Sequence, residues 1–138
     1  MLSTIQANAK RINELQARID ETFEHRDESP EGLRAWKNAC AQAHKEYGDL
    51  AFPGGYAAGL EKIKQGDAAT IEVALLYLEH TPYCFRSQYV ATTLGRALNK
   101  LTLPEPLASR FSRWKETKKE RRTNRYSQLR AANAARRG

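Results

Sequence analysis

The chain ends in a segment whose side chains could bind phosphate. Residues 110–138 contain eleven Lys and Arg but only two acidic residues, so this segment carries about +9 in a chain whose net charge is +7. A patch of one charge sign concentrates polyanions around it. The candidate contact residues combine cations, mostly three or four positions apart, with interleaved aromatic rings: Arg113, Trp114, Lys115, Lys118, Lys119, Arg121, Arg122, Arg125, Tyr126 and Arg130. On a helix, the cations would form one stripe, with Arg113 and Arg121 flanking it.

This combination of residue types favours a nucleic acid as the partner. Lys and Arg neutralise phosphates, and aromatic rings stack on exposed bases. The sequence has no zinc-finger spacing, helix-turn-helix signal or RNA-recognition aromatic motif, so we expect binding without sequence readout, with RNA favoured over duplex DNA. An acidic protein is the competing partner, and a basic tail without a dedicated partner is the third interpretation. A membrane is not expected, because mainly alanines follow Phe111 and Trp114 where a lipid-binding helix would carry large apolar groups.

Two cysteines and two histidines raise the alternative of a metal site. Cys40 precedes His44 by four residues, and His80 precedes Cys84 by four, a spacing that would place each pair on one side of a helix. However, Thr81-Pro82 interrupts the second pair, and Cys40 falls on an apolar stripe where buried thiols are common. We therefore expect no metal and no other cofactor.

Catalytic chemistry finds little support in the sequence. Arg18 and His25 would place a cation and a general base within two turns of one helix, a spacing that also arises by chance in charged helices. Gly54-Gly55 lacks the Lys and the strand-to-helix context of a phosphate loop. The protein is therefore expected to act by binding rather than as an enzyme.

Apolar residues recur every three or four positions almost throughout, which predicts an all-α fold. The first helix is expected over residues 3–26, with Ser3 as a possible cap and an apolar stripe that ends at Phe23. Capping signals predict the starts of three later helices. These signals are Ser29-Pro30 for the second helix, Asp67 for a fourth over 68–79, and Thr81-Pro82 for a fifth that reaches about Leu101 and carries Phe85, Tyr89 and Val90. A short third helix is expected over 56–64, after Pro53-Gly54-Gly55.

Short connections between these helices predict antiparallel hairpins. We expect five to six helices in a compact bundle or a short solenoid-like stack, with a basic helix at the C-terminus. Pro104 and Pro106 mark the expected boundary between a helical-hairpin domain, 1–103, and a basic arm, 104–138. The net charge of residues 1–109 is about −2, so the excess of positive charge belongs to the arm.

The first helix offers an interaction surface of a different class. Its apolar stripe, which includes Ile5, Ile12 and Leu15, is long enough to form a homodimer interface, although packing within the same chain is favoured. The main functional alternative is therefore a protein-interaction module, such as an adaptor or a toxin-neutralising partner, that uses this helix or the hairpin surface. The N-terminus lacks the apolar run of a secretory signal, so we expect a soluble, cytoplasmic protein.

Overall fold

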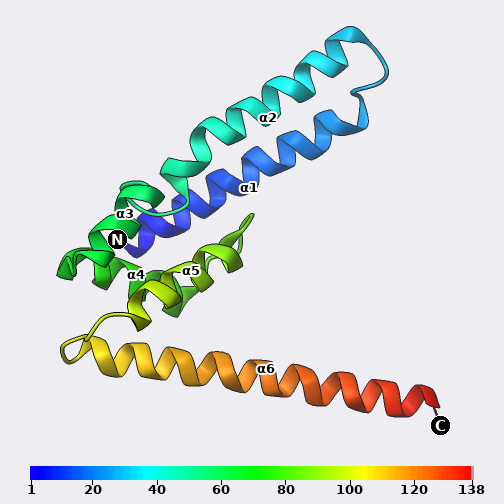
Figure 1. Ribbon diagram of the computed structural model, residues 1–138. Coiled ribbons are helices and arrows are strands. Elements are labelled where there is room, and N and C mark those ends of the chain that lie inside the picture. Colours follow the sequence, from blue (N-terminus) through cyan, green and yellow to red (C-terminus); the bar gives the residue numbers. More distant parts are fainter. Residues whose placement is uncertain (138) are drawn as a thin grey trace. The chain divides into compact units, whose positions relative to one another are not determined.

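The computed structural model describes the backbone of residues 1–137, and the side chains of residues 122, 125, 126, 136 and 137 lie outside the description. Within residues 1–137, six α-helices follow one another: α1 (Leu2–Glu24), α2 (Pro30–Leu50), α3 (Tyr56–Lys64), α4 (Ala68–His80), α5 (Ser87–Asn99) and α6 (Leu107–Arg137) (Figure 1). Residues 1–137 contain no strand, so the all-α prediction is confirmed. The chain divides into two compact units, Met1–Leu101 with α1 to α5 and Thr102–Gly138 with α6.

Helices α1 and α2 lie side by side and run in opposite directions (Figure 1). Ile5, Ile12 and Leu15 of α1 are buried, at 2%, 4% and 7% exposure. On the surface, Arg11 donates two hydrogen bonds to the carboxylate of Glu46, through Nε at 3.0 Å and Nη2 at 2.9 Å. The paired contact fixes the register of α1 against α2 in addition to the apolar packing.

The turn between α1 and α2 follows the predicted capping signal. Ser29 Oγ accepts a hydrogen bond from the backbone N–H of Gly32 at 3.0 Å, and Pro30 occupies the first helical position. A side chain at position 32 would collide with the carbonyl oxygen of His25, so the chain can reverse here only with glycine. The predicted start of the second helix is therefore confirmed.

The core of the first unit gathers around α4. Ala74, Leu75 and Leu78 in α4 have 0%, 0% and 1% exposure, and α4 packs on α3, α5 and α1. Asp67 begins this helix by accepting a hydrogen bond from the backbone N–H of Thr70 at 3.0 Å, and hydrogen bonds from Thr70 lower the pKa of the carboxyl. The Asp67 cap predicted from the sequence is therefore confirmed.

The predicted start of the fifth helix is wrong. Thr81 does not cap the helix that follows, because its hydroxyl donates to the carbonyl of Leu78 at 2.9 Å and closes α4 instead. Residues 81–86 consequently form a loop, and α5 begins at Ser87. Phe85 lies before the helix rather than on it. Tyr89 is 65% exposed, because Val90, Leu94 and Leu98 form the buried side of α5.

The first helix also differs from its prediction at its C-terminal end. It ends at Glu24, and Phe23 is 46% exposed rather than part of the buried stripe. Phe23 packs its ring edge-to-face with Trp36 and stacks under the Arg26 guanidinium, 3.5 Å from the ring centroid. None of the helices described here is both long and apolar enough to cross a lipid bilayer.

A close backbone approach yields a test of the packing. A Cβ at Gly59 would lie 2.8 Å from Cε1 of the buried Phe52 ring and closer still to Cδ1. We expect Gly59→Ala to lower the free energy of unfolding by about 1–3 kcal/mol, because a close-packed core does not absorb an extra methyl group.

Gly48 provides the matched control, because a Cβ there would meet no atom within 4 Å. Gly48→Ala should stabilise the protein by about 1 kcal/mol through its higher helix propensity. Urea unfolding followed by circular dichroism measures both variants. Equal unfolding midpoints for the two would contradict the packing described for Phe52.

Candidate nucleic-acid interface

All ten candidate contact residues lie on the single helix α6. Its 31 residues give a rod about 46 Å long at 1.5 Å per residue. Arg113, Lys115, Lys118, Lys119, Arg121 and Arg130 are exposed, and Trp114 is half-buried. The predictions for Arg122, Arg125 and Tyr126 concern side chains outside the described part of the chain.

Helical geometry gathers the central cations on one side of α6. With about 100° of rotation per residue, positions 115, 118, 119, 122 and 125 fall within an arc of roughly 120°. Glu116 and Glu120 lie on the opposite side of the helix. The acidic residues of the segment therefore do not interrupt the arc, which we call the cationic face.

Arg113 does not flank the cationic face as predicted. Its position lies about 180° from the middle of the arc, on the same side as Glu116 and Glu120. The prediction treated nearness in sequence as nearness on the helix surface. Arg121 and Arg130 do lie at the edges of the face, one on each side.

Aromatic rings at the start of the cationic face are in contact with its lysines. The rings of Phe111 and Trp114 are stacked, with centroids 5.9 Å apart and planes 12° apart. Lys115 Nζ lies 4.6 Å from the centroid of Phe111, and Lys118 Nζ lies 5.1 Å from that of Trp114. A ring face attracts a cation through its quadrupole. The geometry therefore favours one role for Trp114, the positioning of Lys118. It favours the predicted role in base stacking less.

The four residues of the alternative metal set do not come together. Cys40 and Cys84 are free and half-buried, whereas His44 and His80 are exposed. Burial raises the pKa of the Cys84 thiol, which disfavours the thiolate that a metal needs. Within the described part of the chain, no three His, Cys, Asp or Glu side chains form a group that could hold a metal ion.

His25 pairs with Glu28, so the position of His25 has an explanation that does not involve catalysis. Its Nδ1 lies 2.9 Å from Oε2 of Glu28, an ion pair across the α1–α2 turn when the ring is protonated. This hydrogen bond, followed by the charge of Glu28, raises the pKa of His25 above its ordinary value.

The sequence prediction missed three exposed aromatic residues in the first unit. Tyr83, Phe85 and Tyr89 are 92%, 49% and 65% exposed. Their signal in the sequence was the absence of acidic residues between Glu79 and Glu105, but the expected helix placed Phe85 and Tyr89 among apolar neighbours. We call these three residues the aromatic edge.

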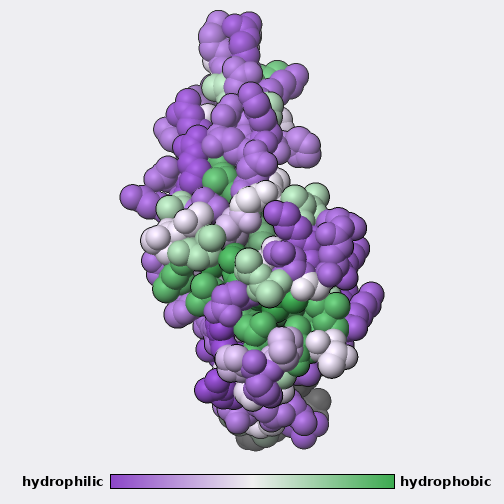
Figure 2. Space-filling view, turned by 90° about the vertical axis from the view of Figure 1, so that its left-hand side faces the viewer, coloured by the Kyte–Doolittle hydropathy of each residue, from purple (hydrophilic) through white to green (hydrophobic). Residues whose placement is uncertain are grey.

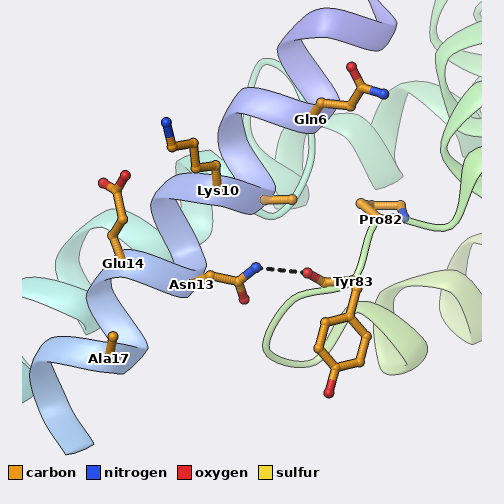
Figure 3. Close-up of a pocket in the computed structure, with 8 residues that line it drawn as sticks. Gln6, Lys10, Asn13, Glu14, Ala17, Pro82 and Tyr83 are labelled. Atoms are coloured by element: carbon orange, nitrogen blue, oxygen red, sulfur yellow. Dashed lines mark hydrogen bonds between the residues drawn. The ribbon is translucent and has the colours of Figure 1, made fainter. Parts of the chain in front are cut away.

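An open groove of about 520 Å³ lies between α1 and the loop that carries Tyr83 (Figure 3). Ala9, Asn13 and Ala17 contribute from α1, and Pro82 and Tyr83 contribute from the loop. Asn13 Nδ2 donates to the Tyr83 carbonyl at 2.9 Å, while the phenol ring points away from α1 (Figure 3). Glu14 and Lys10 also line the groove, so it lacks the one-signed charge of α6.

Comparison with protein-family models, curated proteins and solved structures finds no match to this chain. Its functional interpretation therefore depends on the arrangement of its own residues. The cationic face is the described feature that most narrowly defines a partner, because it selects for negative charge along an extended line.

The pairing of His25 with Glu28 predicts a pH effect. The folded-state pKa of His25 is raised, so the pair stabilises the fold fully below the ordinary His value of 6.5 and loses this effect as pH rises through the folded pKa. We expect Glu28→Gln to lower the pKa of His25, measured by NMR titration of the ring protons. A pKa unchanged by this substitution would contradict the pairing.

Proposed function

We propose that the protein is a non-catalytic, cytoplasmic nucleic-acid-binding protein that contacts phosphates through the cationic face of α6. RNA is favoured over duplex DNA, since the chain carries no groove-reading motif. The observation that carries the proposal is the separation of charge around α6, with the Lys and Arg arc on one side and Glu116 and Glu120 on the other.

Positioned cations strengthen this interpretation. The Trp114 ring lies beneath the Lys118 ammonium, and the Phe111 ring lies beneath that of Lys115. Side chains held in this way lose less conformational entropy when they contact a phosphate. The neighbouring Lys119 and Arg121 are exposed and extend the face toward its edges.

A protein partner held by α1 is the weaker alternative. Ile5, Ile12 and Leu15 are buried within the chain itself, so the apolar stripe is not presented to another molecule. The far end of the α1–α2 pair, at the top of Figure 2, is mostly hydrophilic. An acidic protein that docks on α6 remains the competitor that experiment must distinguish.

Charge-neutralising substitutions test the proposal. Replacing Lys118, Lys119, Arg121, Arg122 and Arg125 together by Gln should abolish retention on immobilised RNA and on heparin, because most of the face loses its charge. Circular dichroism should show the first unit still folded. Retention equal to that of the unmodified protein would contradict the proposal.

A matched pair of double variants removes the effect of net charge. Lys118→Gln with Lys119→Gln changes the cationic face, whereas Lys62→Gln with Lys64→Gln removes the same charge from α3. We expect the first pair to weaken RNA binding by about tenfold or more, at up to roughly 1 kcal/mol per phosphate contact, and the second to change it little. Equal losses would mean that only overall charge matters.

A further inference from the structure

The aromatic edge is exposed in a way that aromatic side chains of a folded domain seldom are. Tyr83 is 92% exposed and Tyr89 is 65% exposed, although large rings usually lose most of their surface on folding. Arg86 lies between them in the sequence, and its guanidinium is 5.3 Å from the centroid of the Phe85 ring. The edge therefore presents flat rings and a planar cation together.

Side chains from three helices hold the backbone of this loop in place. Asn13 of α1 donates to the Tyr83 carbonyl at 2.9 Å, and Tyr47 of α2 donates through its hydroxyl to the Phe85 carbonyl at 3.1 Å. Ser87 of α5 accepts from the N–H of Cys84 at 3.4 Å. The rings are thus displayed on a fixed loop, which lowers the entropy cost of binding.

The backbone is strained at both ends of this loop, which indicates that the loop does more than connect α4 to α5. Thr81 and Arg86 adopt left-handed conformations, with φ of 35° and 62°. For residues other than glycine, each such conformation costs about 1–3 kcal/mol. Such strain clusters at binding sites, where the surroundings enforce it. Tyr83 lies on this loop and is 92% exposed.

The segment that carries the aromatic edge is positively charged, unlike the preceding chain, although Glu14 and Lys10 of α1 both line the groove beside Tyr83. Residues 80–104 contain Arg86, Arg96 and Lys100 but no acidic residue, whereas residues 1–79 contain nine Lys and Arg against thirteen Asp and Glu. Tyr89 and Arg96 are seven residues apart in α5 and lie on the same side of it. A ring and a cation on one side of a helix match the base and the phosphate of a nucleotide.

We propose that Tyr83 and Tyr89, with Arg86 and Arg96, form a stacking platform for unpaired bases of a single-stranded nucleic acid. This inference rests on the proposed function for the class of partner, and it adds that the partner exposes its bases. Aromatic stacking tolerates every base, because each has a π-face. The aromatic edge would therefore recognise single-strandedness, whereas the cationic face of α6 recognises charge.

A protein partner fits the aromatic edge less well than bases do. On the side of α5 that carries Tyr89, Thr93 is half-buried, Arg96 is exposed, and the exposed Lys100 follows as the C-cap of the helix. Protein interfaces surround aromatic anchors with a core from which charged residues are depleted. The edge lacks such a core and has cations that suit phosphates.

The test compares a fluorescein-labelled oligothymidylate with an abasic strand of the same length. Both strands carry the same phosphates, so only the first can stack. We expect Tyr83→Ala with Tyr89→Ala to weaken binding of the oligothymidylate by about tenfold or more, measured by fluorescence anisotropy, and to leave the abasic strand unaffected.

Two further variants separate stacking from structural damage. Tyr83→Phe with Tyr89→Phe keeps both rings and should bind the oligothymidylate like the unmodified protein. Phe23→Ala removes an exposed ring from α1, ten residues beyond the Asn13 contact, and should leave both affinities unchanged. Circular dichroism verifies that each variant is folded.

The outcomes distinguish this inference from the α6 proposal. If the Tyr-to-Ala variant binds both strands like the unmodified protein, the platform is overturned while binding through α6 stands. If the Gln variant of α6 binds the abasic strand normally and the Tyr-to-Ala variant still loses oligothymidylate, the platform is supported and the α6 proposal is not. Equal affinity of the unmodified protein for the two strands would overturn the platform.

Discussion

The cost of removing charge from water is the constraint on which this structure depends. Lys and Arg side chains cannot be buried without partners, whereas apolar side chains gain free energy from burial. In residues 1–101, apolar positions recur closely enough to build a core around Leu75, Leu78 and Leu94. Beyond Trp114, cations occupy the side of α6 that would otherwise carry apolar residues, so the helix presents charge instead.

The same constraint explains which predictions the sequence could support. Helix starts at Pro30 and Ala68 follow from local chemistry, because Ser29 and Asp67 accept hydrogen bonds from N–H groups only three residues away. Thr81-Pro82 has the same local pattern, but its hydroxyl bonds backward to Leu78. Thr81 therefore closes α4, and the next helix begins only at Ser87. The sequence alone could not reveal that outcome.

The candidate site shows a similar limit. The basic segment and its helical spacing could be read directly, since charge and period are properties of the sequence. The position of Arg113 also follows from helical spacing, whereas the contact of Trp114 with Lys118 needed the structure of α6. The loop that carries Tyr83 is held by a hydrogen bond from Asn13, seventy residues away. No pattern within one segment encodes such a contact.

The proposed binding uses two kinds of contact. The cations of α6 contact phosphates, and the aromatic rings of the first unit stack on bases. Phosphate contacts give affinity that falls with salt, while stacking gives preference for unpaired bases and depends on salt only weakly. A protein built in this way would bind many single strands of different sequence.

The salt dependence of single-stranded RNA binding tests the central claim most directly. If about six cations of α6 contact phosphates, the logarithm of the binding constant should fall linearly with the logarithm of salt concentration, with a slope of roughly −4. Replacing Lys118, Lys119, Arg121, Arg122 and Arg125 by Gln should bring that slope to between about −1 and zero. A slope near zero for the unmodified protein, or one that the Gln replacements leave unchanged, would contradict the account.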